Sequence, residues 1–152
     1  MSDLYAVLLS WAVTLSGYPM PEQAAEIVPV SHQTLVEQAC GGRECKVLGW
    51  FPPGRRIYLD DRLEPEGNLV AASIVVHELV HYLQYQSGHF DAFSCSKAIE
   101  LEREAYAVQR EFLLRYGVYQ PVGVSSHRVG CVLAQDAEVD GERPQDTLSP
   151  VP

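Results

Sequence analysis

Basic residues and long apolar runs are both scarce in this chain of 152 residues. Lys and Arg number 11 against 20 Asp and Glu, which gives a formal net charge of −9 with neutral histidines. Nucleic acids and anionic membranes are bound by clustered positive charge, so the composition argues against both as partners. No apolar run reaches the roughly 18 residues that a transmembrane helix needs, and we expect no membrane insertion.

The apolar stretch at residues 4–15 lacks the basic flank of a secretory signal. Asp3 precedes it, and no Lys or Arg does. We therefore interpret this stretch as a core helix. The localisation stays open, because an even number of cysteines is also compatible with an extracytoplasmic protein.

Four cysteines are present, Cys40, Cys45, Cys95 and Cys131. They could form two disulfides in an oxidising compartment or remain buried thiols in a reducing one. The pairing Cys40–Cys45 with Cys95–Cys131 is favoured, because the first pair encloses a short loop with two glycines and the second pair flanks a predicted helix. A structural zinc on all four is less favoured, since only one close pair exists.

Capping and turn residues predict an α+β fold, mainly helical, with a small β-hairpin beside one long helix. The chain reads as one domain over residues 1–134, followed by a disordered acidic and proline-rich tail over residues 135–152. The predicted helices are residues 4–16, 31–40, 69–86 and 94–116, with an ambiguous short helix at 125–133; the predicted strands are residues 46–51 and 55–59.

Residues 77–81 read His-Glu-Leu-Val-His, the pattern H-E-x-x-H, within the 69–86 helix. Residues i and i+4 lie about 40° apart round a helix and one turn apart along it, so His77 and His81 can bind one metal ion. Glu78 misses that ligand shell but can reach a water on the metal. The helix is apolar nearly all round, and buried histidines are costly unless something satisfies them. The alternative is a helical interaction domain in which they are ordinary core residues.

A third ligand is expected, because catalytic zinc usually has three protein ligands. In the second long helix, 100° per residue places only Gln109 and Glu102 as polar residues within the apolar face. Glu100, Glu104 and Glu111 lie on the opposite face, most simply a solvated one. An unpaired buried carboxylate is costly, so Glu102 is the candidate ligand, and a buried salt bridge with an arginine is its alternative.

With Glu102 included, the pattern resembles that of the gluzincins, metallopeptidases with two histidines from H-E-x-x-H and a glutamate from a second helix. Residues 102–106, Glu-Arg-Glu-Ala-Tyr, resemble their E-x-x-A signature. The spacing from His81 to Glu102 is similar to that of thermolysin-like enzymes. Several gluzincins have an acidic residue four positions after the ligand glutamate, where this chain has Tyr106, so their usual second carboxylate is not identified here.

The resemblance covers residues 55–116 and implies a minimal zincin-like metallopeptidase with one zinc per chain. The implied ligands are His77, His81 and Glu102. The implied reaction is hydrolysis of a peptide or protein substrate, with Glu78 accepting a proton from the zinc-held water. The alternative is a catalytically silent, zinc-binding interaction domain; the presence of Glu78 argues against it, since degenerate sites usually lose that residue.

Two residues are candidates for stabilising the oxyanion of the reaction, Tyr106 and His127. Tyr106 lies one turn after Glu102, and its alternative role is core packing. His32 and His89 have no motif around them and are expected at the surface.

Residues 55–59 are expected to form an edge strand, because no third strand of comparable strength occurs between Lys46 and the 69–86 helix. The resemblance implies the same, since zincins align an extended substrate along an edge strand at this place. Main-chain hydrogen bonds would then supply affinity with little sequence selectivity. Arg55 and Arg56 would flank this groove and favour acidic substrates. The alternative is that the chain's own N-terminal region covers the edge.

Overall fold

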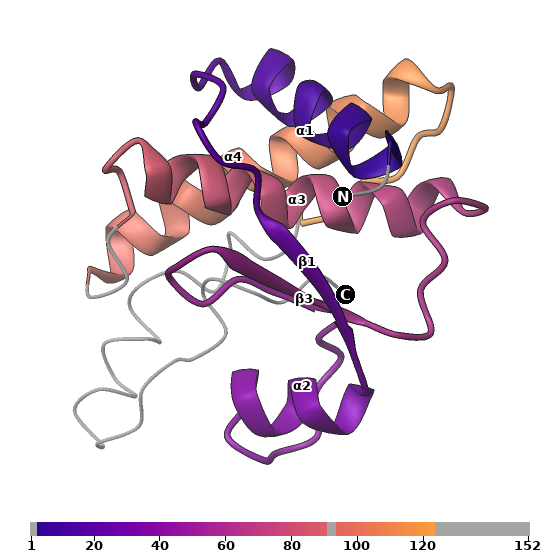
Figure 1. The fold of residues 1–152 in the computed structure, drawn as a ribbon, viewed down its shortest axis with the longest axis vertical. Coiled ribbons are helices and arrows are strands. Elements are labelled where there is room, and N and C mark those ends of the chain that lie inside the picture. The colour runs from indigo at the N-terminus through magenta and orange to yellow at the C-terminus, as the bar shows by residue number, and fades with distance from the viewer. Residues whose placement is uncertain (1–2, 91–93, 124–152) are drawn as a thin grey trace.

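The computed structural model describes residues 3–90 and 94–123, and this part of the chain is an α+β fold, as predicted (Figure 1). The helices are α1 (Asp3–Ser16), α2 (His32–Ala39), α3 (Leu69–Gln86) and α4 (Cys95–Arg115), and the strands are β1 (Glu26–Val30), β2 (Gly49–Trp50) and β3 (Arg56–Asp60). Along the sequence the elements follow in the order α1, β1, α2, β2, β3, α3 and α4.

Side-chain caps set the starts of three helices, close to where the sequence predicts them. Ser31 accepts a hydrogen bond from the Thr34 amide (3.1 Å) ahead of α2, and Asn68 accepts one from the Ala71 amide (2.9 Å) ahead of α3. Ser94 caps α4 in the same way. Each cap satisfies an amide that the first helical turn leaves without a partner. The four predicted helices within the described residues are confirmed.

The three strands form one mixed sheet in the order β1-β3-β2. β2 and β3 are antiparallel, with Gly49 opposite Leu59 and Trp50 opposite Tyr58, which confirms the predicted hairpin. β1 runs parallel to β3 on its other side. β3 is therefore the central strand, and the prediction that residues 55–59 form an edge strand is wrong.

The sequence prediction missed β1, whose five residues include Pro29. Proline argues against a strand, because it donates no ladder hydrogen bond. In β1 the missing amide proton of Pro29 removes no hydrogen bond to β3. The Glu26 amide donates to the Arg55 carbonyl (2.8 Å), and the Asp61 amide donates to the Val30 carbonyl (2.8 Å). Residues 26, 28 and 30 thus face β3, and the nitrogen of Pro29 faces outward.

Helix α3 lies at the centre of the fold, in contact with α1 and α4 and also with β2 and β3 (Figure 1). Its residues 71–84 are all buried. The main core joins these helices to the inner face of the sheet, where Ile57 and Leu59 are buried. A smaller core on the other face packs α2 against Val47, and the predicted Cys40–Cys45 disulfide, with a Cα–Cα distance of 6.5 Å, lies beside it.

Several predictions fall outside the described residues: the 125–133 helix, the 135–152 tail, and the positions of His127 and Cys131. Cys95 is disulfide-bonded, but its predicted partner Cys131 belongs to that undescribed part. Among the helices that are described, none combines the length and apolar character needed to cross a membrane.

Candidate metal centre

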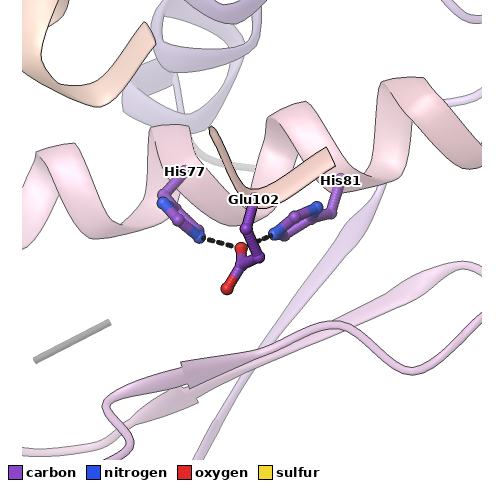
Figure 2. Close-up of side chains that lie close together, drawn as sticks. All are labelled: His77, His81 and Glu102. Carbon is purple, nitrogen blue, oxygen red and sulfur yellow. Dashed lines mark hydrogen bonds and ion pairs between the residues drawn. The ribbon is translucent and has the colours of Figure 1, made fainter. Parts of the chain in front are cut away.

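The two histidines of the motif and Glu102 come together between α3 and α4 (Figure 2). Glu102 Oε1 lies 3.0 Å from His77 Nε2 and 2.6 Å from His81 Nε2. One ligand atom from each residue lies within 4.8 Å of the others, and all three residues are buried. Two imidazole nitrogens and a carboxylate oxygen at this spacing can hold one metal ion. The residues fit the ligand set that the sequence predicts.

A buried amide fixes the orientation of each histidine. His77 Nδ1 lies 3.0 Å from Gln109 Oε1, and His81 Nδ1 lies 2.8 Å from Gln84 Oε1. Because an amide oxygen only accepts, the Nδ1 atom of each ring carries a proton, and a neutral ring then offers its Nε2 lone pair to a metal ion. This is the tautomer that metal binding through Nε2 requires. A hydrogen bond from Nδ1 to a fixed acceptor holds a ligating ring in place.

The amides are themselves anchored, so that their oxygens point at the rings. Gln109 Nε2 donates to Ser73 Oγ (3.1 Å), and Ser73 Oγ donates to the Val70 carbonyl (2.6 Å). Gln84 Nε2 donates to the Leu101 carbonyl (3.0 Å) and to Glu104 Oε1 (3.2 Å). These anchors make the reversed amide orientation unfavourable at both positions.

Glu78 is fully buried, and neither of its carboxylate oxygens has a hydrogen-bond partner within residues 3–90 and 94–123. Strand β2 lies directly against it. A Cβ added to Gly49 would come within 3.0 Å of Glu78 Cγ and 3.3 Å of its Oε2. A side chain at this position would require Glu78 or Ile74 to shift, so glycine suits the close approach that encloses the carboxylate beside the histidines. A buried carboxyl without a partner is costly, and such a cost is typical of a functional group.

Burial and mutual charge shift the titration of these groups. Burial, and then the negative charge of Glu102, raise the pKa of Glu78 well above its ordinary value. Burial also lowers the pKa of His77, which favours the neutral ring that binds metals. For Glu102, burial is outweighed by His81 and His77, which lower the pKa of its carboxyl. Glu102 therefore stays ionised while Glu78 is the more basic carboxylate.

Among the described residues, the basic side chains in contact with the Glu102 carboxylate are those of His77 (3.0 Å) and His81 (2.6 Å). The alternative of a buried salt bridge with an arginine is therefore not what this part of the structure contains. Glu102 is 7% exposed, as its place on the apolar face of the helix predicts.

Tyr106 lies beside the cluster, with its ring edge-on to His77 at a centroid distance of 4.5 Å. It is buried, and a Cβ added at Gly123 would overlap its ring, so the segment after α4 packs against its face. These contacts show a packing role against His77. A role of its hydroxyl in catalysis stays a prediction, as does that of His127, which lies outside the described residues.

The sequence analysis missed Gln84 and assigned Glu104 to a solvated face. Glu104 is partly buried and accepts hydrogen bonds from Gln84 and from the Tyr18 hydroxyl. Glu100 does lie in solvent, with a side chain 65% exposed. The missed signal was the spacing of three residues between His81 and Gln84, which places them on neighbouring positions of one helix face. The sequence analysis places Gln109 on the apolar face of its helix but does not identify its hydrogen bond to His77.

Two outlying predictions have different outcomes. His89 is exposed, as expected. His32 instead bridges Asp60 Oδ2 (3.1 Å) and Glu44 Oε1 (2.9 Å) at the end of the sheet.

The prediction that Arg55 and Arg56 flank a substrate groove along an edge strand does not match their contacts. Arg55 donates to the Ala24 carbonyl, and Arg56 pairs with Glu26 (3.4 Å). Both arginines thus bind the segment that leads into or forms β1.

Comparison with known proteins adds no relative: no family model, no curated protein and no solved structure matches the chain. The functional argument therefore rests on the residues and geometry described above.

Proposed function

We propose that this protein is a zinc-dependent metallopeptidase of the gluzincin type, with His77, His81 and Glu102 as ligands and Glu78 as general base. The observation that carries the proposal is the pairing of a buried two-histidine, one-carboxylate cluster with a second buried carboxylate. Glu78 follows His77 directly on α3, so the same helix that supplies two ligands also supplies the base.

Zinc is the ion that suits this ligand set best. Imidazole nitrogens favour zinc and other transition metals over magnesium or calcium, which prefer oxygen-rich sites. Three protein ligands with an open position are typical of catalytic zinc sites, whereas structural sites have four. The structure brings three such residues together, and the fourth position would serve water or substrate.

Zinc, when bound, supplies a Lewis acid that polarises a peptide carbonyl and lowers the pKa of water. Glu78 would take up a proton from the attacking water and pass it to the amine that leaves. Burial raises the pKa of Glu78 well above its ordinary value, which makes this carboxylate a stronger base toward the attacking water. The enclosure provided by Gly49 keeps bulk water from this carboxylate.

The edge strand beside the site is β2, in place of the strand that the sequence suggested. The Asp60 amide donates to the Leu48 carbonyl (2.9 Å), so Gly49 and Leu59 form a non-hydrogen-bonded pair of the ladder. The amide and carbonyl of Gly49 therefore point away from β3, beside Glu78. An extended peptide pairing with that edge would pass close to the general base.

The proposal is tested with purified protein, its zinc content and a broad peptide-library cleavage assay. We expect one zinc per chain and cleavage by the wild type, with a loss of at least ~10²-fold in Glu78→Gln, whose zinc content is unchanged. Glu100→Gln, a charge change on the exposed face of α4, is the control. Protein without zinc after metal-supplemented purification contradicts the metal centre, and cleavage that persists in Glu78→Gln contradicts the assigned base. Zinc binding without any cleavage favours the silent interaction domain.

A further inference from the structure

The two histidine anchors differ in charge, although their geometry is alike. At His77 the anchoring amide of Gln109 ends on a neutral serine hydroxyl (3.1 Å). At His81 the anchoring amide of Gln84 ends on a carboxylate, Glu104 Oε1, at 3.2 Å. Only the His81 side therefore connects to a side chain that can carry charge.

Gln84 has no freedom to turn over. Its amide nitrogen uses both donors, one on the Leu101 carbonyl (3.0 Å) and one on Glu104, and its side chain is fully buried. The reversed orientation would place its oxygen against two acceptors. Both acceptors disfavour the reversed orientation, and Glu104 is the one that a substitution can remove.

Glu104 is in turn held from a distant part of the chain. The hydroxyl of Tyr18, in the connection between α1 and β1, donates to the same Glu104 oxygen. Burial, and then Glu104, raise the pKa of Tyr18, so the phenol remains a donor. The ring of Tyr18 also packs against that of His89 at 5.8 Å. The chain of contacts runs from Tyr18 through Glu104 and Gln84 to His81.

We infer that Glu104 is a positioning residue of the metal centre, which acts through Gln84 to hold the His81 ring with Nε2 toward the ion. The inference rests on the proposed metal site and adds a residue outside its ligand set. A carboxylate behind the amide also polarises it, which strengthens the hydrogen bond to His81 and makes Nε2 a better donor. Through Tyr18, the α1–β1 connection thus contributes to the orientation of the His81 ring.

The test compares zinc affinity, measured by competition with a chromophoric chelator, across four variants of the full chain. Gln84→Leu should weaken zinc binding by ~10–100-fold and Glu104→Leu by ~10-fold, since second-shell changes have effects of this size. Glu104→Gln keeps the acceptor and should recover most of the loss. Glu100→Leu, two residues before Glu102 on the exposed face, should bind like the wild type.

A second readout separates positioning from general destabilisation. In the zinc-loaded protein, the ¹⁵N-imidazole spectrum should show a hydrogen-bonded Nδ1–H for both histidines. Glu104→Leu should shift the His81 resonance and leave that of His77 in place, and the milder Tyr18→Phe should shift it less. Unchanged affinity and an unchanged His81 resonance in Glu104→Leu overturn the inference, as does an equal shift of both histidines. A wild type that binds no zinc overturns the proposed metal centre and this inference with it.

Discussion

The described part of the chain contains two clusters of histidine and carboxylate, and their buried carboxylates differ in how they are compensated. At the end of the sheet, Asp60 is fully buried but receives Arg62 Nη2 at 2.7 Å, Arg62 Nε at 2.9 Å and His32 at 3.1 Å. At the metal centre, Glu102 is paired only with the two histidines among the described residues, and Glu78 has no partner there.

The difference lies in the counter-charge. Arg62 is permanently cationic, and its hydrogen bonds lower the pKa of Asp60, so this cluster is complete without any added ion. The candidate metal centre instead has a histidine, His77, whose pKa burial lowers, a second carboxylate whose pKa is raised, and amides that orient both imidazole rings. A cluster whose buried carboxylate finds all its hydrogen-bond and charge partners among neighbouring side chains is typical of a structural role. A cluster that leaves a buried carboxyl without such partners is typical of a site that binds a ligand.

The largest expected effect is the loss of a metal ligand. Glu102→Ala should weaken zinc binding by more than ~100-fold, beyond the range of second-shell changes, because it removes one of three ligands. Asp60→Ala removes the buried carboxylate of the cluster at the end of the sheet and should leave zinc content unchanged. Elemental analysis of the two purified variants checks this. Equal zinc in both would mean that the two clusters do not differ in the way described.

The next effect concerns the contact that encloses Glu78. Gly49→Val should destabilise the fold by about 3 kcal/mol, because its side chain would overlap Glu78 and Ile74 at a place where a Cβ alone comes within 3.0 Å. Gly67→Val is the matched control, since a Cβ there meets nothing within 4 Å. Urea unfolding of both variants measures the difference. A Gly49→Val protein as stable as its control would show that β2 does not enclose the carboxylate.

A smaller effect is expected at the structural cluster. Asp60→Asn should lower the free energy of unfolding by about 1–2 kcal/mol, since it weakens charge-assisted hydrogen bonds to Arg62 and His32. The pKa of Asp60 is lowered on folding, so its stabilisation is present above its ordinary value of 3.8 and is lost as the pH falls through the folded value. The gap between wild type and variant should therefore close in acid. A gap that persists there would contradict the ionised Asp60.

The smallest effect is the contribution of His32. Its hydrogen bond to Glu44 raises its pKa above 6.5, opposed by a smaller effect of burial. A raised folded pKa means that the stabilisation is fully present below 6.5 and is lost as the pH rises through the folded value. Melting temperatures of wild type and His32→Gln should thus converge toward alkaline pH. Curves that stay parallel across this range would show that His32 titrates alike in both states.

Local signals in the sequence were sufficient for the helices and for most of the candidate site. The caps Ser31, Asn68 and Ser94 lie within a few residues of the segments that they start, so the information is local. The ligand pair His77 and His81 follows from the helical repeat alone. Glu102 could be identified because its own helix has an apolar face, and a carboxylate on such a face needs an explanation.

Strand β1 and the contacts between distant segments could be recognised only in the tertiary structure. β1 was missed because Pro29 speaks against a strand, and only pairing with β3 shows that its nitrogen faces outward. That pairing makes β3 the central strand and leaves β1 and β2 as the outer strands of the described sheet. The packing of β2 on α3 brings Gly49 against Glu78. Glu104 received its role from Tyr18, which lies 86 residues away in sequence.

The residue types and helical periodicity by themselves determined an α+β chain with two histidines and two glutamates suited to one metal centre. Which groups satisfy those side chains depends on how α4, the α1–β1 connection and β2 pack around α3. The physical reason is range: capping and helical spacing act over a few residues, whereas hydrogen-bond partners and burial depend on contacts between segments far apart in the sequence.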